Sequence, residues 1–105
     1  MNKPHQLQPR EHKLIALYCQ CELGMTPRQF YEKWEVTHEQ MAEICDRSLS
    51  TVRGWFKRGR HYRHPTPTDV RHLALMNFLL EHFEEIPATL WKQLCPSLDS
   101  LPRNR

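Results

Sequence analysis

This 105-residue sequence contains four helix-start signals, which restrict the folds that it can adopt. Two of them share one construction, Thr-Pro-Arg-Gln at residues 26–29 and Thr-Pro-Thr-Asp at residues 66–69. In each, the threonine oxygen caps free amides of the first turn, the proline suits a position that needs no N–H, and the last residue closes a capping box. Thr37 and Ser48 stand as N-caps before two further apolar runs. Together these signals predict an all-α fold.

Apolar residues between the signals recur at helical spacing, and no segment alternates as a strand does. We expect a compact bundle of about five to six helices in one domain, residues 8–95, with flexible segments at 1–7 and 96–105. Phe30, Tyr31 and Trp34 are expected on the buried side of a short helix that starts at residue 26, and Gly24 and Gly59 are expected to end two helices. The other expected helices cover residues 8–22, 38–45, 49–58, 67–85 and 88–94.

Composition excludes several classes of protein. The three glycines form no phosphate-binding loop pattern, and no apolar run approaches the roughly 18 residues that cross a membrane. Residues 1–10 are polar and contain two prolines, unlike a signal peptide, so we expect a cytoplasmic protein. No Ser/His/Asp or Cys/His pairing stands out, and we therefore expect no catalytic residue and no cofactor.

The cysteine and histidine positions do not fit a metal site. Cys19 and Cys21 lie two apart in an expected helix, so their side chains point about 200° apart. Cys45 and Cys95 fall among apolar helical positions, and we interpret the cysteines as small buried hydrophobic residues. The three histidines of residues 61–72 match no tetrahedral pattern with paired cysteines, so no metal ligand is expected.

Positive charge is concentrated in one segment. Residues 47–64 contain six Lys or Arg, two His and no Asp or Glu. The nine other basic residues (15 − 6) stand against 12 acidic residues, so the rest of the chain has a net charge of −3. A basic segment inside an otherwise acidic protein is typical of a nucleic-acid partner.

Within residues 38–58 the apolar positions predict two crossing helices. Ala42 is the small residue at which they touch, Val52 packs back on it, and Trp55 lies one turn further along the same face. Met41 and Cys45 complete this seam, and core packing is favoured for Trp55 over base stacking. The outward face of the second helix is small at its start and cationic towards its end, which suits entry into a DNA major groove.

Residues 40–42 (Gln-Met-Ala) and 48–56 (Ser-Leu-Ser-Thr-Val-Arg-Gly-Trp-Phe) resemble the helix-turn-helix of bacterial and phage repressors, resolvases and transposase DNA-binding domains. The resemblance covers residues 38–58 and implies a double-stranded DNA partner. The residues that it implies for base reading are Ser48, Leu49, Ser50, Arg53, Gly54 and Lys57. Those that we expect to contact phosphates are Thr37, Gln40, Thr51, Arg58, Arg60 and Arg63.

Three positions depart from the pattern of this family. Asp46 and Arg47 form the turn, where the family often has a glycine followed by an aliphatic residue that packs inward. Asp46 can adopt a left-handed backbone, but Arg47 cannot replace the aliphatic residue. Gly54 costs the second helix about 1 kcal/mol against alanine, and close approach to DNA would explain why a glycine stands there.

The leading hypothesis is a small transcription regulator that binds DNA. Since the apolar surface of residues 70–86 exceeds what one side of a small core covers, we expect a homodimer through Leu75, Leu79 and Phe83. One alternative keeps DNA binding and makes the chain an accessory subunit of a mobile-element or plasmid machine. Another is a protein-interaction adaptor with a basic face, although an adaptor does not need a small, polar helix tip at residues 48–53.

Overall fold

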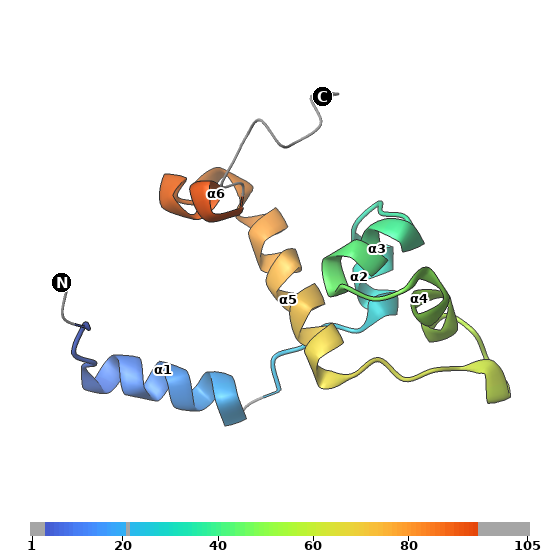
Figure 1. Cartoon of the computed structure of the whole chain (residues 1–105), viewed down its shortest axis with the longest axis horizontal. Coiled ribbons are helices and arrows are strands. Elements are labelled where there is room, and N and C mark those ends of the chain that lie inside the picture. Colours follow the sequence, from blue (N-terminus) through green and yellow to red (C-terminus); the bar gives the residue numbers. More distant parts are fainter. Residues whose placement is uncertain (1–3, 21, 95–105) are drawn as a thin grey trace.

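The computed structural model of this chain describes residues 4–20 and 22–94. Within these residues the regular structure is helical throughout, which confirms the all-α prediction. Residues 96–105, predicted to form a flexible tail, lie outside the described residues. The elements, in which η marks a 3₁₀ turn, are α1 (Pro9–Gln20), α2 (Pro27–Lys33), α3 (His38–Cys45), α4 (Leu49–Trp55), η1 (Gly59–His61), α5 (Pro67–Glu81), η2 (Phe83–Glu85) and α6 (Ala88–Leu94) (Figure 1).

Four helices begin where the hydroxyl side chains predict them. Thr26, Thr37 and Thr66 each accept a hydrogen bond from the amide three residues on, and that residue's side chain accepts from the threonine amide in return. Ser48 Oγ accepts from Thr51 N at 3.2 Å and so caps α4. Since these bonds satisfy free amides of the first turn within the same segment, the starts of α2 to α5 depend on local sequence alone.

The end of α4 differs from the prediction. The helix ends at Trp55 rather than at Arg58, and the carbonyl oxygen of Gly54 accepts a hydrogen bond from Arg63 N at 3.0 Å. This long-range bond holds the following segment against the helix and turns it away from the helix axis. Gly59 therefore does not end α4; it begins η1 with a φ of 66°.

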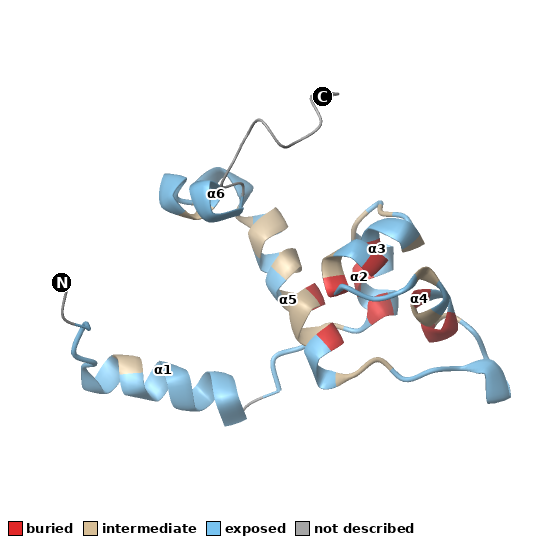
Figure 2. Ribbon diagram, viewed as in Figure 1, coloured by how far each residue is buried: buried red, intermediate tan, exposed pale blue. Residues whose placement is uncertain are grey.

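One apolar core lies between α2, α3, α4 and α5, where the buried residues are drawn red in Figure 2. Trp55 is 4% exposed and packs inside this core, as its spacing predicts. Tyr31 was expected to be buried but is 44% exposed, because its ring lies at the core's edge against the rings of His38 and Phe56, at centroid distances of 5.2 and 5.3 Å. The buried apolar residues are Phe30, Met41, Ala42, Cys45, Val52, Trp55 and Leu73.

Helix α1 lies outside this core. Its predicted apolar face is present, yet none of its residues is buried, and Leu14 is 66% exposed. The helix touches the start of α5 at its C-terminal end, where the Tyr18 ring centroid lies 5.2 Å from Cζ of Arg71. Helices α1 and α5 are both shorter than predicted, at residues 9–20 and 67–81. No helix in the described part of the chain is long and apolar enough to cross a membrane.

One ion pair joins the turn between α3 and α4 to the start of α5. Arg47 donates from Nε to Asp69 Oδ1 at 2.9 Å and from Nη2 to Oδ2 at 3.1 Å. Asp69 is 2% exposed, and its Oδ2 also accepts from N and Oγ1 of Thr66 at 2.8 and 2.9 Å. Burial by itself raises the pKa of Asp69, but the bonds from Arg47 and Thr66 outweigh burial and hold that pKa below its ordinary value.

We predict that Asp69→Asn lowers the free energy of unfolding by about 1–3 kcal/mol at pH 7. Both carboxylate oxygens accept from donors, so an amide group in either orientation places an NH2 against a donor. Because the pKa of Asp69 is lowered on folding, the carboxylate stabilises the fold above about pH 4, and this contribution disappears as the pH falls through the lowered pKa.

Urea unfolding of the two proteins between pH 2.5 and 7 measures this effect. The difference in stability should be constant at higher pH and should shrink below about pH 4. Glu81→Gln is the matched control, since it makes the same change in an exposed pair with Lys33 and should leave stability unchanged. Equal effects of the two substitutions would contradict the assigned role of Asp69.

Candidate nucleic-acid interface

Helices α3 and α4 are joined by a three-residue turn, residues 46–48. Asp46 adopts the left-handed backbone that its position predicts, with φ 56° and ψ 52°. The amides of Asp46 and Arg47 both donate to the carbonyl oxygen of Ala42, with Arg47 N at 2.9 Å. Ala42 and Val52 are both buried in the core that α3 and α4 share, as the predicted seam between the two helices requires. The turn is thus fixed by backbone bonds on one side and by the Arg47–Asp69 pair on the other.

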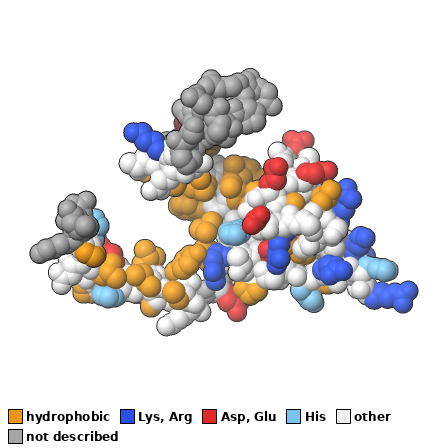
Figure 3. Space-filling view, viewed as in Figure 1, with side chains coloured by type: hydrophobic (Ala, Val, Ile, Leu, Met, Phe, Trp, Pro, Cys, Tyr) orange, Lys and Arg blue, Asp and Glu red, His pale blue; other side chains and the backbone are white. Residues whose placement is uncertain are grey.

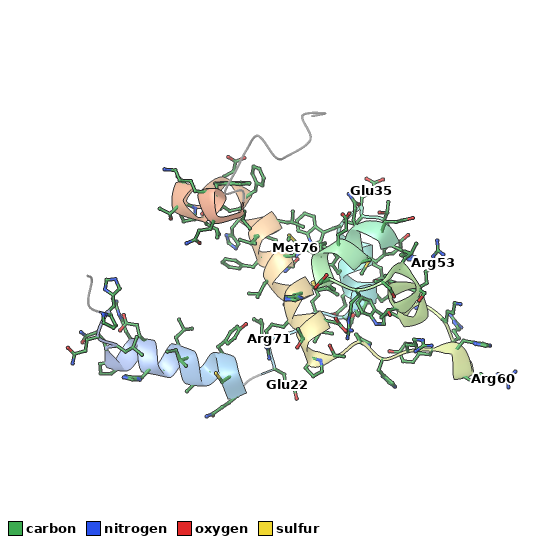
Figure 4. The ribbon with its side chains drawn as sticks, viewed as in Figure 1. Glu22, Glu35, Arg53, Arg60, Arg71 and Met76 are labelled. Atoms are coloured by element: carbon green, nitrogen blue, oxygen red, sulfur yellow. The ribbon has the colours of Figure 1, made fainter. Side chains whose placement is uncertain are left out.

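The outer face of α4 presents small and cationic side chains. Ser50 and Arg53 are exposed, Leu49 is half-buried, and Figure 4 shows Arg53 directed away from the core. Lys57 is exposed as well, but it lies beyond the end of the helix rather than in its last turn. Arg53 is therefore the one basic residue on α4 itself.

Gly54 does not belong to this outer face, which corrects its predicted role in base reading. It is buried, and a Cβ atom at this position would lie 2.9 Å from both Cγ and Cδ of Arg63. The glycine in α4 thus makes room for the returning chain. The bond from Arg63 N to Gly54 O accompanies this close approach.

We use the name basic surface for five exposed residues on α4 and the segment after it: Arg53, Lys57, Arg58, Arg60 and Arg63. None of the ion pairs formed among the described residues includes any of them. The sixth basic residue of the segment, Arg47, is engaged by Asp69 and so does not contribute to this surface. Figure 3 shows Lys and Arg side chains gathered at the end of the molecule formed by α4 and η1, with acidic groups gathered elsewhere on the visible face.

A groove of about 440 Å³ lies within the basic surface. Its walls are mostly polar and include no carboxylate, so an anionic group that enters meets cations and hydroxyl donors and no acidic side chain. Ser50 and the backbone of Gly54 come from α4, and the other lining residues come from the segment that folds back on it. The lining residues are Ser50, Gly54, Lys57, Arg60, His61, Tyr62 and Arg63.

Four of the polar residues expected at the interface also build the helix caps. Thr37 and Gln40 bond to each other's amides at 3.0 and 2.8 Å, so both are held at the start of α3. Ser48 Oγ caps α4 and donates to Thr51 Oγ1 at 2.9 Å. The cap uses the side-chain oxygen of Gln40, which leaves its amide NH2 as a donor.

The residues expected to pair two chains lie on α5 and η2. Leu75 is 39% exposed and Phe83 is 54% exposed, while Leu79 is half-buried. Phe78, at 57% exposed, belongs to the same surface and was not singled out from the sequence. Its signal was available, because it lies three residues after Leu75 and so on the same helix face.

The cysteines fall into different environments. Cys45 lies in the core, where burial first and then the Asp69 carboxylate raise the pKa of its thiol to about 11. Cys19 was expected to be buried but is exposed, because α1 lies outside the core. Cys21 and Cys95 lie outside the described residues. Among residues 4–20 and 22–94, no group of three or more His, Cys, Asp or Glu is arranged to hold a metal ion.

No protein-family model, curated protein or solved structure matches this chain. The candidate interface is therefore defined by geometry: a small polar helix face beside the basic surface. The feature that sequence reasoning missed is the partner of Arg47. The sequence contained a signal for this pair, because Arg47 occupies a turn position that usually packs inward and so needs an acidic partner. Asp69, the capping residue of α5, was the candidate partner.

We predict that the effect of Gly54→Ala on stability depends on Arg63. In the native chain the added Cβ collides with Arg63, which cancels the helix-propensity gain of about 1 kcal/mol. In an Arg63→Ala background the two closest contacts are gone, so the same substitution should stabilise the protein by up to about 1 kcal/mol. A double-mutant cycle from urea unfolding measures the difference.

Gly59→Ala is the matched control for this cycle. Position 59 has a φ of 66° and no atom within 4 Å of an added Cβ. Alanine there should cost about 1 kcal/mol through backbone strain alone, equally in both backgrounds. An identical effect of Gly54→Ala with and without the Arg63 side chain would show that α4 and the following segment are not packed as described.

Proposed function

We propose that this protein binds double-stranded DNA as a small transcription regulator, with α3, the turn and α4 as a helix-turn-helix and α4 in the major groove. The observation that carries the proposal is the basic surface, five exposed cations without an acidic partner among the described residues, next to a helix face of small polar side chains. Unpaired cations attract the phosphate backbone, and a small face lets a helix approach base edges.

Base reading is assigned to the outer face of α4. Arg53 lies in the second turn, and a bidentate contact to guanine O6 and N7 suits its guanidinium. Ser48, Leu49 and Ser50 form the tip of the helix, where side chains are short enough for the backbone to approach the groove. Lys57 follows the end of α4, and we assign it to the edge of the DNA major groove.

Phosphate contacts are assigned to the segment after α4. Arg60 and Arg63 line the polar groove, whose positive charge suits a phosphate group of the DNA backbone, and Arg58 precedes them in the same segment. The packing of Arg63 against Gly54 holds this segment close to α4, so phosphate and base contacts have a fixed spacing. Thr37, Gln40 and Thr51, held by the helix caps, provide further donors towards the backbone of the DNA.

Two copies of the chain acting together complete the proposal. A single recognition helix reads only a short site, and two-fold pairing is the usual way to gain affinity and selectivity. The exposed apolar residues of α5 and η2, Leu75 and Phe83 among them, support such pairing.

We predict that Arg53→Ala separates base reading from phosphate binding. A preferred duplex is first selected from random double-stranded DNA, and affinity for it and for random duplex is then measured by fluorescence anisotropy at several salt concentrations. Arg53→Ala should weaken binding to the preferred duplex about 5- to 150-fold, equivalent to 1–3 kcal/mol, and should change binding to random duplex much less.

Arg60→Ala should weaken binding to both duplexes together and reduce the salt slope by about one. Lys92→Ala removes a cation from exposed α6, far along the chain from the basic surface, and is the matched control with no expected effect. If Arg53→Ala weakens both duplexes equally, Arg53 contacts a phosphate instead of a base. If neither arginine substitution changes affinity for any duplex, the proposed function is wrong.

A further inference from the structure

Two apolar surfaces of this chain have no covering element among the described residues. One is the face of α1 that carries Leu14, Ile15, Leu17 and Tyr18, which are 66, 49, 47 and 42% exposed. The other lies on α5 and α6, where the exposed residues include Leu75, Phe78, Phe83, Trp91 and Leu94. In Figure 3 hydrophobic side chains gather along α1 and again on the α5–α6 side of the molecule.

The α5–α6 surface contains an apolar groove that can accept an apolar side chain. A groove of about 220 Å³ lies where α5 bends into α6, and its walls are almost entirely apolar. The residues that line it are Phe78, Leu79, His82, Glu85, Ile86, Pro87 and Leu90. An apolar side chain that fills such a groove removes apolar surface of both partners from water.

The chain's own α1 is held away from its own α5–α6 surface. The connection from α1 to α2 is held to α5 on both sides. On the α1 side, the Tyr18 ring lies against the Arg71 guanidinium; on the α2 side, Met25 N donates to Val70 O at 3.0 Å. Gly24 lies so close to Val70 that an added Cβ would be 2.9 Å from Cγ2 of that residue. Residues on both sides of the connection thus contact the start of α5, at the opposite end of that helix from α6, and Figure 4 shows Arg71 at this junction.

We infer that the occupant of the α5–α6 surface is α1 of a second copy of this chain, and that the exchange is reciprocal. Because each chain carries both halves of the contact, a two-fold pair covers all four surfaces at once. The charges agree with this pairing: α1 has a net charge of +1 (Arg10 and Lys13 against Glu11), and residues 83–94 have −1 (Lys92 against Glu84 and Glu85), since Glu81 is already paired with Lys33. The inference rests on the proposed pairing of two chains but not on DNA binding.

Light scattering after gel filtration of the full chain, without DNA and at tens of micromolar, tests the exchange. The native chain should have the mass of two copies. Leu14→Glu on α1 and Phe78→Lys on α5 should each give a monomer, since a charge then enters an apolar contact. Ala16→Glu lies on the opposite face of α1 and should leave the pair intact. Both target side chains are more than half exposed within one chain, so helix content by circular dichroism should not change.

Mixing the two monomeric variants provides the decisive measurement. One of the two α1 contacts in the mixed pair is fully native. The other sets the introduced carboxylate of the Leu14→Glu chain against the introduced ammonium group of the Phe78→Lys chain. The mixture should therefore regain the mass of two copies. A monomeric native chain, a pair that survives Leu14→Glu, or a mixture that stays monomeric would each overturn the inference. Since no DNA is present, these outcomes leave the test of DNA binding by Arg53 and Arg60 untouched.

Discussion

The buried carboxylate of Asp69 is the point at which the local and long-range order of this protein meet. Its oxygens close the cap of α5 with Thr66 and accept both donors that Arg47 sends from the turn between α3 and α4. The turn and the start of α5 are thereby joined through one side chain that is 2% exposed. The segment after α4 leads into the start of α5, so the cap at Asp69 also fixes the end of that segment. The buried charge of Asp69 is tolerated because both of its carboxylate oxygens accept hydrogen bonds from Arg47 or Thr66.

The basic surface follows from that arrangement. Asp69 withdraws Arg47 from the positively charged segment, and the five cations that remain lie on one helix face and on the chain that folds back over Gly54. The contact at Gly54 holds the aliphatic part of Arg63, which leaves the guanidinium for an anion. A surface of this kind binds phosphate strongly only if the cations are spaced in advance, and the packing of the segment provides that spacing.

The apolar surfaces outside the core have no covering element among the described residues. Helices α2 to α5 close one small core, and neither α1 nor α6 adds a buried residue to it. In the proposed pair, exchange of α1 would give these elements a partner and would set the distance between the two recognition helices. The spacing of two half-sites on DNA depends on that distance, so dimer geometry and site selection would be linked.

Much of this fold could be predicted from the sequence, because it depends on interactions between residues close together in the chain. A threonine or serine bonds to an amide only three residues away, so the starts of α2 to α5 and the bounds of α3 could be predicted, as could the seam of Ala42 and Val52 and the burial of Trp55. The end of α4, the burial of Gly54 and the partner of Arg47 depend on residues 9 to 22 positions away. The exposure of α1 depends on where the chain turns after it. Helical periodicity says which residues share a face, but only the packed structure decides whether another element covers that face, because the same apolar stripe suits a core and an interface equally.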